Sequence, residues 1–370
     1  MIIILMAAVI LAGIKLAPKK SFFENSFSID QTRALKGLFA IVVMFHHLYG
    51  YLVWHFQSLQ YFKNLGYLMV GGFFLISGYG LMYGVMKKQN YLKGFFRKRI
   101  LSLIVPYYII VAVYIAMKYY SIGNNDAFKL YVKESLLGLQ LWFVPVMVLL
   151  YVLFRIAFIG YGKMKCKLIS PIILTVLTAV YIAAFFITQQ MKINVLYGSV
   201  WMDTAMCFVV GMWYCILKDK ITPFLQKYYY VITALSLIAF ALLFHKVCMI
   251  PEGYEWPTKI TTLLYKELSA IMFCFVTLLL SMKIHIGNKV LNVCGDHSFE
   301  IYLSHAIFIT LFRWGTISLS LGSFKFEYLL NIESNDFYMT AIIVGTFVFS
   351  IIVHKLCGLI LKPIQRSVKK

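Results

Sequence analysis

Long runs of apolar residues, separated by short polar segments, dominate the pattern along the chain. Most runs hold roughly 17 to 24 residues, the length that an α-helix needs to cross the hydrocarbon core of a bilayer. Eleven segments have this character: residues 1–16, 37–54, 66–86, 100–117, 139–159, 168–187, 199–217, 231–246, 262–281, 298–315 and 337–360. We therefore predict an all-α membrane bundle of ten or eleven transmembrane helices that fills residues 1–370 as a single domain.

The first of these segments is the weakest. Residues 1–16 are short and lack the basic region that begins a cleaved signal peptide. The basic sequence KLAPKK at 15–20 is typical of a helix that enters the membrane from outside. Ten helices remain if this segment does not span, and the orientation of the others is unchanged.

The composition supports the membrane prediction. Hydrophobic residues make up 61% of the chain and charged residues only 13%, whereas soluble domains are near half apolar and a quarter charged. The seven cysteines lie mostly inside apolar runs, without CxxC or Cys/His ligand spacing. We therefore expect neither a disulfide framework nor a metal site.

The net charge of +21 could indicate a nucleic-acid partner, but the distribution of charge indicates a membrane. Basic residues gather in alternate loops, such as KKQNYLKGFFRKR at 87–99 and the tail KPIQRSVKK at 362–370, while acidic residues gather in others, such as PEGYEW at 251–256. This asymmetry follows the positive-inside rule. We predict a multi-pass plasma-membrane protein with a cytoplasmic C-terminus, in contact with lipid and without a nucleic-acid partner.

Ionisable side chains within membrane spans usually face the interior of a bundle or a wet cavity, and they are candidates for function. The predicted spans contain His46, His47, Glu267, Glu300, His305 and His354. Glu267 and His354 lie near predicted span ends, where solvation at the membrane surface also accounts for them.

Helical phase separates the two adjacent histidines. Lys36 and His47 are eleven positions apart, so they differ by only about 20° around a helix, and Arg33 differs from His47 by about 40°. His46 lies about 80° from Lys36 and about 140° from Arg33. One helix could therefore bind an anion at its basic end and present the imidazole of His47 roughly 16 Å further along. We predict that His47 is functional and that His46 is a packing or hydrogen-bonded neighbour.

Histidine suits proton transfer because neutral imidazole takes up a proton near physiological pH. Activation of a hydroxyl for acyl transfer needs such a base. A histidine hydrogen-bonded to a neighbouring helix and a proton-coupled transporter remain alternatives on geometry alone.

Five short motifs then follow one another along the chain: LKGLFAIVVMFHHL (35–48), GGFFLISGYGLMYG (71–84), FFRKRILSLIVPYY (95–108), LWFVPVMVLLY (141–151) and HSFEIYLSHAIF (297–308). In this order they resemble the membrane-bound acyltransferase 3 family, which includes many O-acetyltransferases of bacterial surface polysaccharides. The resemblance covers most of the chain, from about residue 30 to 310.

In the first motif the family typically has Arg, ten further residues and then His. Lys36 stands at the arginine position and His47 at the histidine position. Lysine replaces a bidentate fork with a point charge, and Arg33, one turn earlier, is an alternative source of a guanidinium. The resemblance implies a catalytic His47 assisted by Lys36 or Arg33.

The second and third motifs indicate binding of the acyl donor. Ser77 ends the family's phenylalanine-rich segment, where small residues let helices or a ligand approach closely. Arg97 and Arg99 match the family's basic pair, and guanidinium groups suit the phosphates of coenzyme A. Packing of small residues for Ser77, and a topology anchor or lipid-headgroup contact for the arginines, are the alternatives.

The last two motifs add four candidate residues. Trp142 matches a Trp-Phe pattern, and Tyr302 and His305 match a late Tyr-Leu-x-His pattern in which the two residues share a helix face. Glu300 lies about 140° from His305 around the helix. Glu300 and His305 are therefore not expected to face one substrate.

The resemblance implies transfer of an acyl group, most simply acetyl from acetyl-coenzyme A and without a metal, to a hydroxyl of a cell-surface or lipid-linked carbohydrate. His47 would activate this hydroxyl directly or carry the acyl group as an acyl-imidazole. Some relatives have an extracytoplasmic esterase-like domain. We expect none here, so that either the acceptor reaches the membrane or a separate extracytoplasmic transferase completes the reaction.

Two other classes of function fit the membrane spans. A transporter or flippase of a lipid-linked sugar would also need intramembrane histidines, and a scaffold protein with a degenerate site would need none. The presence of His47, Arg97 and Arg99 favours the enzyme over the scaffold, whereas Lys36 in the arginine position favours the scaffold slightly.

Overall fold

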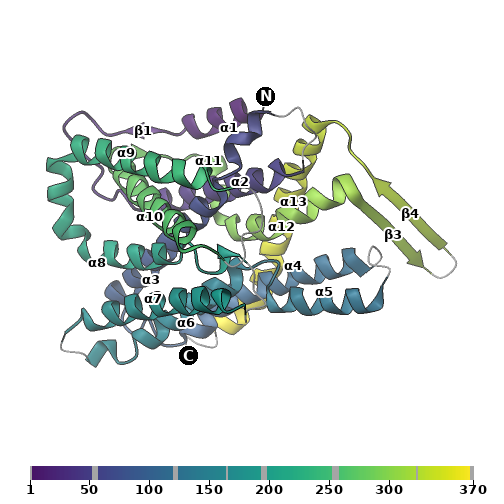
Figure 1. The fold of residues 1–370 in the computed structure, drawn as a ribbon, viewed down its shortest axis with the longest axis horizontal. Coiled ribbons are helices and arrows are strands. Elements are labelled where there is room, and N and C mark those ends of the chain that lie inside the picture. Colours follow the sequence, from purple (N-terminus) through teal and green to yellow (C-terminus); the bar gives the residue numbers. More distant parts are fainter. Residues whose placement is uncertain are drawn as a thin grey trace. The chain divides into compact units, whose positions relative to one another are not determined.

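The computed structural model of the chain describes residues 2–51, 57–119, 124–163, 166–192, 198–251, 258–321 and 324–366. The described residues are predominantly helical (Figure 1). The α-helices are α1 (Ile2–Leu11), α2 (Ile29–Tyr49), α3 (Gly66–Lys87), α4 (Leu101–Tyr119), α5 (Asn125–Leu137), α6 (Phe143–Ala157), α7 (Ile169–Gln190), α8 (Met206–Lys227), α9 (Tyr229–Cys248), α10 (Ile260–Lys283), α11 (Lys289–Asp296), α12 (Ser298–Trp314) and α13 (Asn335–Arg366).

Four short helical segments and two small sheets complete the described structure. The short segments are η1 (Gln57–Phe62), η2 (Phe96–Ile100), η3 (Tyr161–Lys163) and η4 (Ser199–Trp201); η2 is a π-helix and the others are 3₁₀-helices. The strands are β1 (Lys15–Leu16), β2 (Ile284–His285), β3 (Gly315–Leu321) and β4 (Phe324–Leu330), paired antiparallel as β1–β2 and β3–β4.

Seven helices in the described part of the chain are long and apolar enough to cross a membrane. They comprise α3, η2 with α4, α7, η4 with α8, α9, α10 and α13. Four of them, α7, α9, α10 and α13, carry rows of large exposed apolar side chains at helical spacing, such as Ile172, Val176 and Val180 on α7. Such exposed apolar rows are unfavourable in water and suit contact with lipid. The chain is therefore a multi-pass membrane protein.

The remaining predicted spans form shorter or more polar helices. Helix α6 has 15 residues and α12 has 17, and α2 begins with Asp30, Arg33 and Lys36 before its apolar part. The segment 1–16 forms a ten-residue helix, α1, followed by a turn and the strand β1. A ten-residue helix is about 15 Å long, roughly half the thickness of a hydrocarbon core. Among the described residues the structure supports seven spans by length and composition, and the predicted count of ten or eleven is not confirmed.

The described chain forms two compact units, each built from three separate segments. Unit 1 contains residues 1–39, 64–93 and 149–296, and unit 2 contains residues 40–63, 94–148 and 297–370. Helices α2 and α6 contribute residues to both units. The single-domain description of residues 1–370 stays a prediction.

Unit 1 is organised by close packing of α3 on α8. A Cβ atom at Gly78 would collide with the carbonyl oxygen of Phe208, and one at Gly211 would collide with the carbonyl oxygen of Leu75. The two helix backbones therefore touch, as small residues permit in membrane bundles. This contact assigns Gly78 of the second motif to helix packing.

Unit 2 is organised by α12, which packs against α4 and α13. The buried hydroxyl of Tyr338 on α13 donates to the carbonyl oxygen of Ile309 at 2.6 Å, and Ser304 and Ser350 pair at 3.2 Å. These interhelical hydrogen bonds hold α12, which carries the late histidine motif, against α13.

Candidate functional site

Two histidines from opposite ends of the sequence lie ring against ring in unit 2. The imidazoles of His47 on α2 and His305 on α12 stack with centroids 5.0 Å apart and planes inclined by 29°. His305 is only 4% exposed, whereas His47 keeps an exposed surface. One imidazole is thus enclosed by the helices and the other can be reached by a reactant.

Further aromatic rings continue from this pair. The ring of Tyr302 lies 6.1 Å from that of His305, Phe143 lies 4.8 Å from Tyr302, and Trp142 lies 6.4 Å from Phe143. We call His46, His47, Trp142, Phe143, Tyr302 and His305 the ring cluster. It brings together five of the residues expected from the sequence, taken from three distant motifs.

Hydrogen bonds to backbone carbonyls fix two of the imidazoles. His46 Nδ1 lies 3.1 Å from the carbonyl oxygen of Phe62, and His305 Nδ1 lies 3.2 Å from that of Ile301. A carbonyl oxygen can only accept, so each Nδ1 carries the proton, and in the neutral ring Nε2 is left as an acceptor. His46 therefore lies beside His47 and is hydrogen-bonded to the backbone. Its role in activity stays a prediction.

His47 differs from both of these histidines. Within the part of the chain that the structure describes, its ring nitrogens form no hydrogen bond, and its contacts are the rings of His46 at 4.9 Å and His305. An imidazole held by stacking with its nitrogens available can exchange a proton with a bound hydroxyl.

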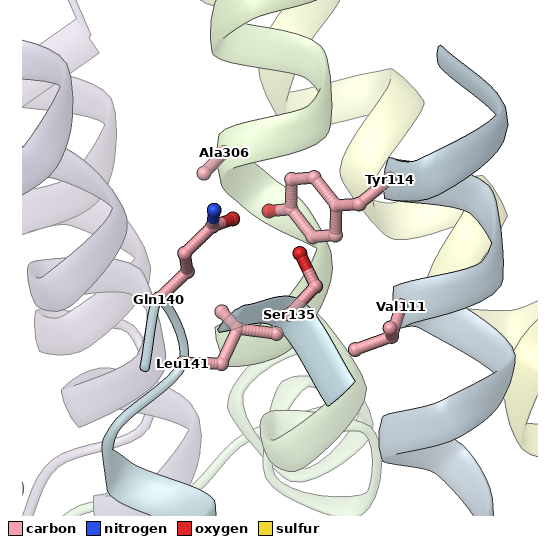
Figure 2. Close-up of a pocket in the computed structure, with 6 residues that line it drawn as sticks. All are labelled: Val111, Tyr114, Ser135, Gln140, Leu141 and Ala306. Atoms are coloured by element: carbon pink, nitrogen blue, oxygen red, sulfur yellow. The ribbon is translucent and has the colours of Figure 1, made fainter. Parts of the chain in front are cut away.

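A cavity of about 150 Å³ lies in unit 2 (Figure 2). It is lined by Val111, Tyr114, Ser135, Gln140, Leu141 and Ala306. Leu141 directly precedes Trp142 in the chain, and Ala306 directly follows His305. Figure 2 shows the hydroxyls of Tyr114 and Ser135 and the amide of Gln140 directed into the same space.

A tight turn places Gln140 at this cavity. Helix α5 ends at Gly138, which has φ = +81° and whose N–H returns to the carbonyls of Glu134 and Ser135. Only glycine takes this left-handed conformation without steric cost, and it is the usual residue after a helix end. The hydroxyl of Tyr107 on α4 donates to the carbonyl oxygen of Ser135, which ties the end of α5 to α4.

The basic pair of the third motif lies at the start of α4. Arg97 is exposed and Arg99 is partly exposed, and both belong to the π-helical turn η2. Single π-helical turns inside longer helices occur frequently at functional sites. This end of α4 presents guanidinium groups that can bind phosphate.

Glu300 lies in a separate interaction within unit 2. Its carboxylate accepts a hydrogen bond from His354 Nδ1 at 2.8 Å, and the ring of His354 also contacts that of His297 at 4.7 Å. Glu300 is buried, whereas the side chain of His354 is about half exposed. This pairing agrees with the expectation that Glu300 and His305 face different partners, and it accounts for His354, which the sequence left as a solvated helix end.

The other predicted residues lie in unit 1. Arg33 forms ion pairs with Asp296 at 3.0 Å and Asp30 at 3.6 Å, and Gly295 packs against its backbone carbonyl. Lys36 and Ser77 are both partly buried. The guanidinium of Arg33 is thus already engaged by two carboxylates of unit 1.

Sequence reasoning missed the polar residues that line the cavity. Tyr114, Ser135 and Gln140 lie in or beside apolar runs, and nothing in their spacing distinguishes them from packing residues. Phe143 belongs to the Trp-Phe pattern of the fourth motif but was not singled out as a candidate. Only the position of Gln140, two residues before Trp142, could have drawn attention to it.

Comparison with known proteins identifies a family for the chain. A family model described as an acyltransferase domain matches residues 28–355. This stretch contains every candidate residue named above, from Arg33 to His354. No curated protein and no solved structure matches the chain.

Proposed function

The chain belongs to the acyltransferase 3 family, and from this membership we propose that it transfers an acyl group at the membrane to a hydroxyl of a cell-surface or lipid-linked carbohydrate. The donor in this proposal is acyl-coenzyme A, most simply acetyl-coenzyme A. The protein would act in the plasma membrane with its C-terminus and the basic start of α4 on the cytoplasmic side.

The stacked pair of His47 and His305 supports this function most directly. An exposed imidazole, packed on a buried one, is suited to act as a base on a bound hydroxyl. His47 accepts the proton of the acceptor hydroxyl while the hydroxyl oxygen attacks the thioester carbonyl carbon. The carbon–sulfur bond then breaks, and the imidazolium of His47 returns the proton to the departing thiolate.

The chain also offers groups that fit the donor. Arg97 is exposed at the cytoplasmic end proposed for α4 and can pair with phosphate through its planar fork of donors. Lys36 shares a helix face with His47 by helical phase and carries a positive charge that suits an anion. Arg33 contributes less because Asp30 and Asp296 already engage it.

The test uses the purified protein in lipid nanodiscs with radiolabelled acetyl-coenzyme A. Hydrolysis or transfer of the label should fall by about 10²- to 10⁴-fold in His47→Ala, the usual contribution of a general base. His46→Ala is the matched control and should retain most activity. Equal loss in both variants, with folded protein, would contradict the assignment, and absence of coenzyme binding by the wild type would favour a transporter.

A second measurement separates direct transfer from an acyl-imidazole. Protein incubated with the labelled donor and no acceptor should retain no label after denaturation if His47 acts only as a base. Label that stays on the wild type and is absent from His47→Ala would instead show a covalent intermediate.

A further inference from the structure

We propose that the cavity lined by Tyr114, Ser135 and Gln140 binds one sugar ring of the acceptor. This assignment rests on the proposed acyl transfer and adds to it the residues that recognise the acceptor. Carbohydrate rings combine apolar C–H faces with hydroxyls that both donate and accept hydrogen bonds. The cavity combines the same two kinds of surface.

The size of the cavity suits one ring. Its volume is about 150 Å³, and an apolar cavity of roughly that volume holds a molecule of benzene. The side chains of Val111, Leu141 and Ala306 supply apolar walls. A single six-membered ring fits such a space, whereas a polysaccharide segment or a whole coenzyme does not.

Three polar side chains can form hydrogen bonds with the hydroxyls of that ring. Tyr114 donates its hydroxyl proton to the carbonyl oxygen of Leu303 at 3.2 Å, so its oxygen can still accept. Ser135 is only 3% exposed, and its hydroxyl is directed into the cavity (Figure 2). Gln140 offers both an N–H donor and a carbonyl acceptor on the same space. A mostly apolar pocket with a small number of polar groups is typical of a site that fixes the orientation of its ligand.

The cavity lies away from the site proposed for the donor phosphates. Tyr114 lies thirteen residues beyond Leu101 on α4, which places it about 20 Å from the basic end of that helix. Donor phosphates and the cavity thus occupy different ends of α4 in unit 2. Two of the lining residues, Leu141 and Ala306, are chain neighbours of Trp142 and His305, so the backbone segments that line the cavity also carry residues of the ring cluster.

An acyl group is the competing occupant, and the polar lining disfavours it. A methyl group would offer no hydrogen-bond partner to the hydroxyl of Ser135 or the amide of Gln140, which is unfavourable where water is excluded. A ring that carries hydroxyls satisfies them.

The test uses the full chain in nanodiscs with radiolabelled acetyl-coenzyme A and a panel of methyl glycosides of hexoses and N-acetylhexosamines as soluble probes. We expect glycoside-dependent transfer or glycoside inhibition of donor hydrolysis. Gln140→Ala and Tyr114→Phe should raise the apparent KM for the active glycoside about tenfold and leave the KM for acetyl-coenzyme A unchanged. Tyr108→Phe, on α4 and outside the cavity lining, is the matched control and should change neither constant.

Ala306→Leu should fill the cavity and abolish the response to glycosides. Because a larger residue can also disturb folding, Ser135→Ala, which removes only a hydroxyl, is measured beside it with thermal unfolding of both variants. A change in the KM for acetyl-coenzyme A, or no response of the folded wild type to any glycoside, would overturn the assignment. Failure of the wild type to hydrolyse or transfer from acetyl-coenzyme A would instead reject the proposed function itself.

Discussion

The imidazole of His305 stacks on that of His47 with ring centroids 5.0 Å apart, and its own Nδ1 is anchored on the carbonyl oxygen of Ile301. The anchored ring therefore limits the positions that the exposed ring of His47 can take. Side chains that hold a catalytic group in place raise activity without touching the substrate.

His305→Ala should accordingly lower acyl transfer by about tenfold or more, because a displacement of roughly 1 Å at a catalytic group can cost as much as a hundredfold. His305→Phe keeps a ring for stacking and should recover part of the lost rate. If His305→Phe were as inactive as His305→Ala, the ring nitrogens of His305, rather than its packing, would be required. The measurement is kcat with labelled acetyl-coenzyme A, beside thermal unfolding of both variants.

Arg97→Ala should weaken binding of the coenzyme more than it changes turnover. An exposed guanidinium on phosphate contributes to ground-state binding, so we expect KM for acetyl-coenzyme A to rise several-fold and kcat to stay near the wild-type value. Arg97→Lys should recover part of the binding because it keeps the charge and loses the fork. Lys129→Ala, a charge change on the exposed pair with Asp126, is the control. An unchanged binding constant in Arg97→Ala would reduce this residue to a topology anchor.

Lys36→Ala and Arg33→Ala should show which of these two basic residues at the start of α2 binds the donor. We expect Lys36→Ala to raise KM for the coenzyme more than Arg33→Ala does, since Lys36 differs from His47 by only about 20° around the helix and Arg33 by about 40°. Asp296→Asn removes one of the two ion pairs of Arg33. If Arg33 does not bind the donor, this substitution should leave donor binding unchanged. A larger effect of Arg33→Ala on KM would show that its guanidinium serves the donor after all.

Gly78→Ala should destabilise the protein, because its Cβ would collide with the carbonyl oxygen of Phe208. Overpacking of this kind typically costs about 1–3 kcal/mol. Gly80→Ala, two residues further along α3, meets no atom within 4 Å and should be neutral or slightly stabilising. Thermal unfolding in nanodiscs provides the comparison, and equal melting temperatures would contradict direct contact of the two backbones.

The orientation in the membrane is tested by cysteine labelling in a cysteine-free background. A cysteine at Asn125 should react with an impermeant maleimide added outside intact cells, and a cysteine at Lys163 should not. This pattern follows from the concentration of basic residues in alternate loops. The reverse pattern would place the C-terminus outside and would move the basic start of α4 away from a cytoplasmic donor.

Apolar run length was sufficient to predict several helices closely. The runs 66–86, 231–246 and 262–281 became α3, α9 and α10 with ends within about two residues, because an apolar segment that crosses lipid must form its hydrogen bonds internally as a helix. The run 139–159 became only the fifteen residues of α6, since the left-handed Gly138 and the turn after it take up the start of the run.

The ring cluster was predicted only in parts. Helical phase distinguished His47 from His46, and sequence resemblance selected Trp142, Tyr302 and His305, but no local pattern shows that these residues touch one another. Contacts between distant segments depend on how the helices pack. The hairpin of β3 and β4 was not predicted, because residues 316–336 lie between two predicted spans and were assigned no structure of their own.

The π-helical turn η2 has a consequence for how the basic residues are directed. Its five residues, Phe96–Ile100, correspond to an α-helical turn carrying one inserted residue. Deleting one residue within the turn would restore the α-helical period and rotate everything before it by about 100° around the axis of α4. The number of residues in this turn therefore decides on which face of the helix the guanidinium of Arg97 lies. Deleting Ile100, which removes neither arginine, should therefore turn both guanidinium groups to another face of the helix and weaken donor binding.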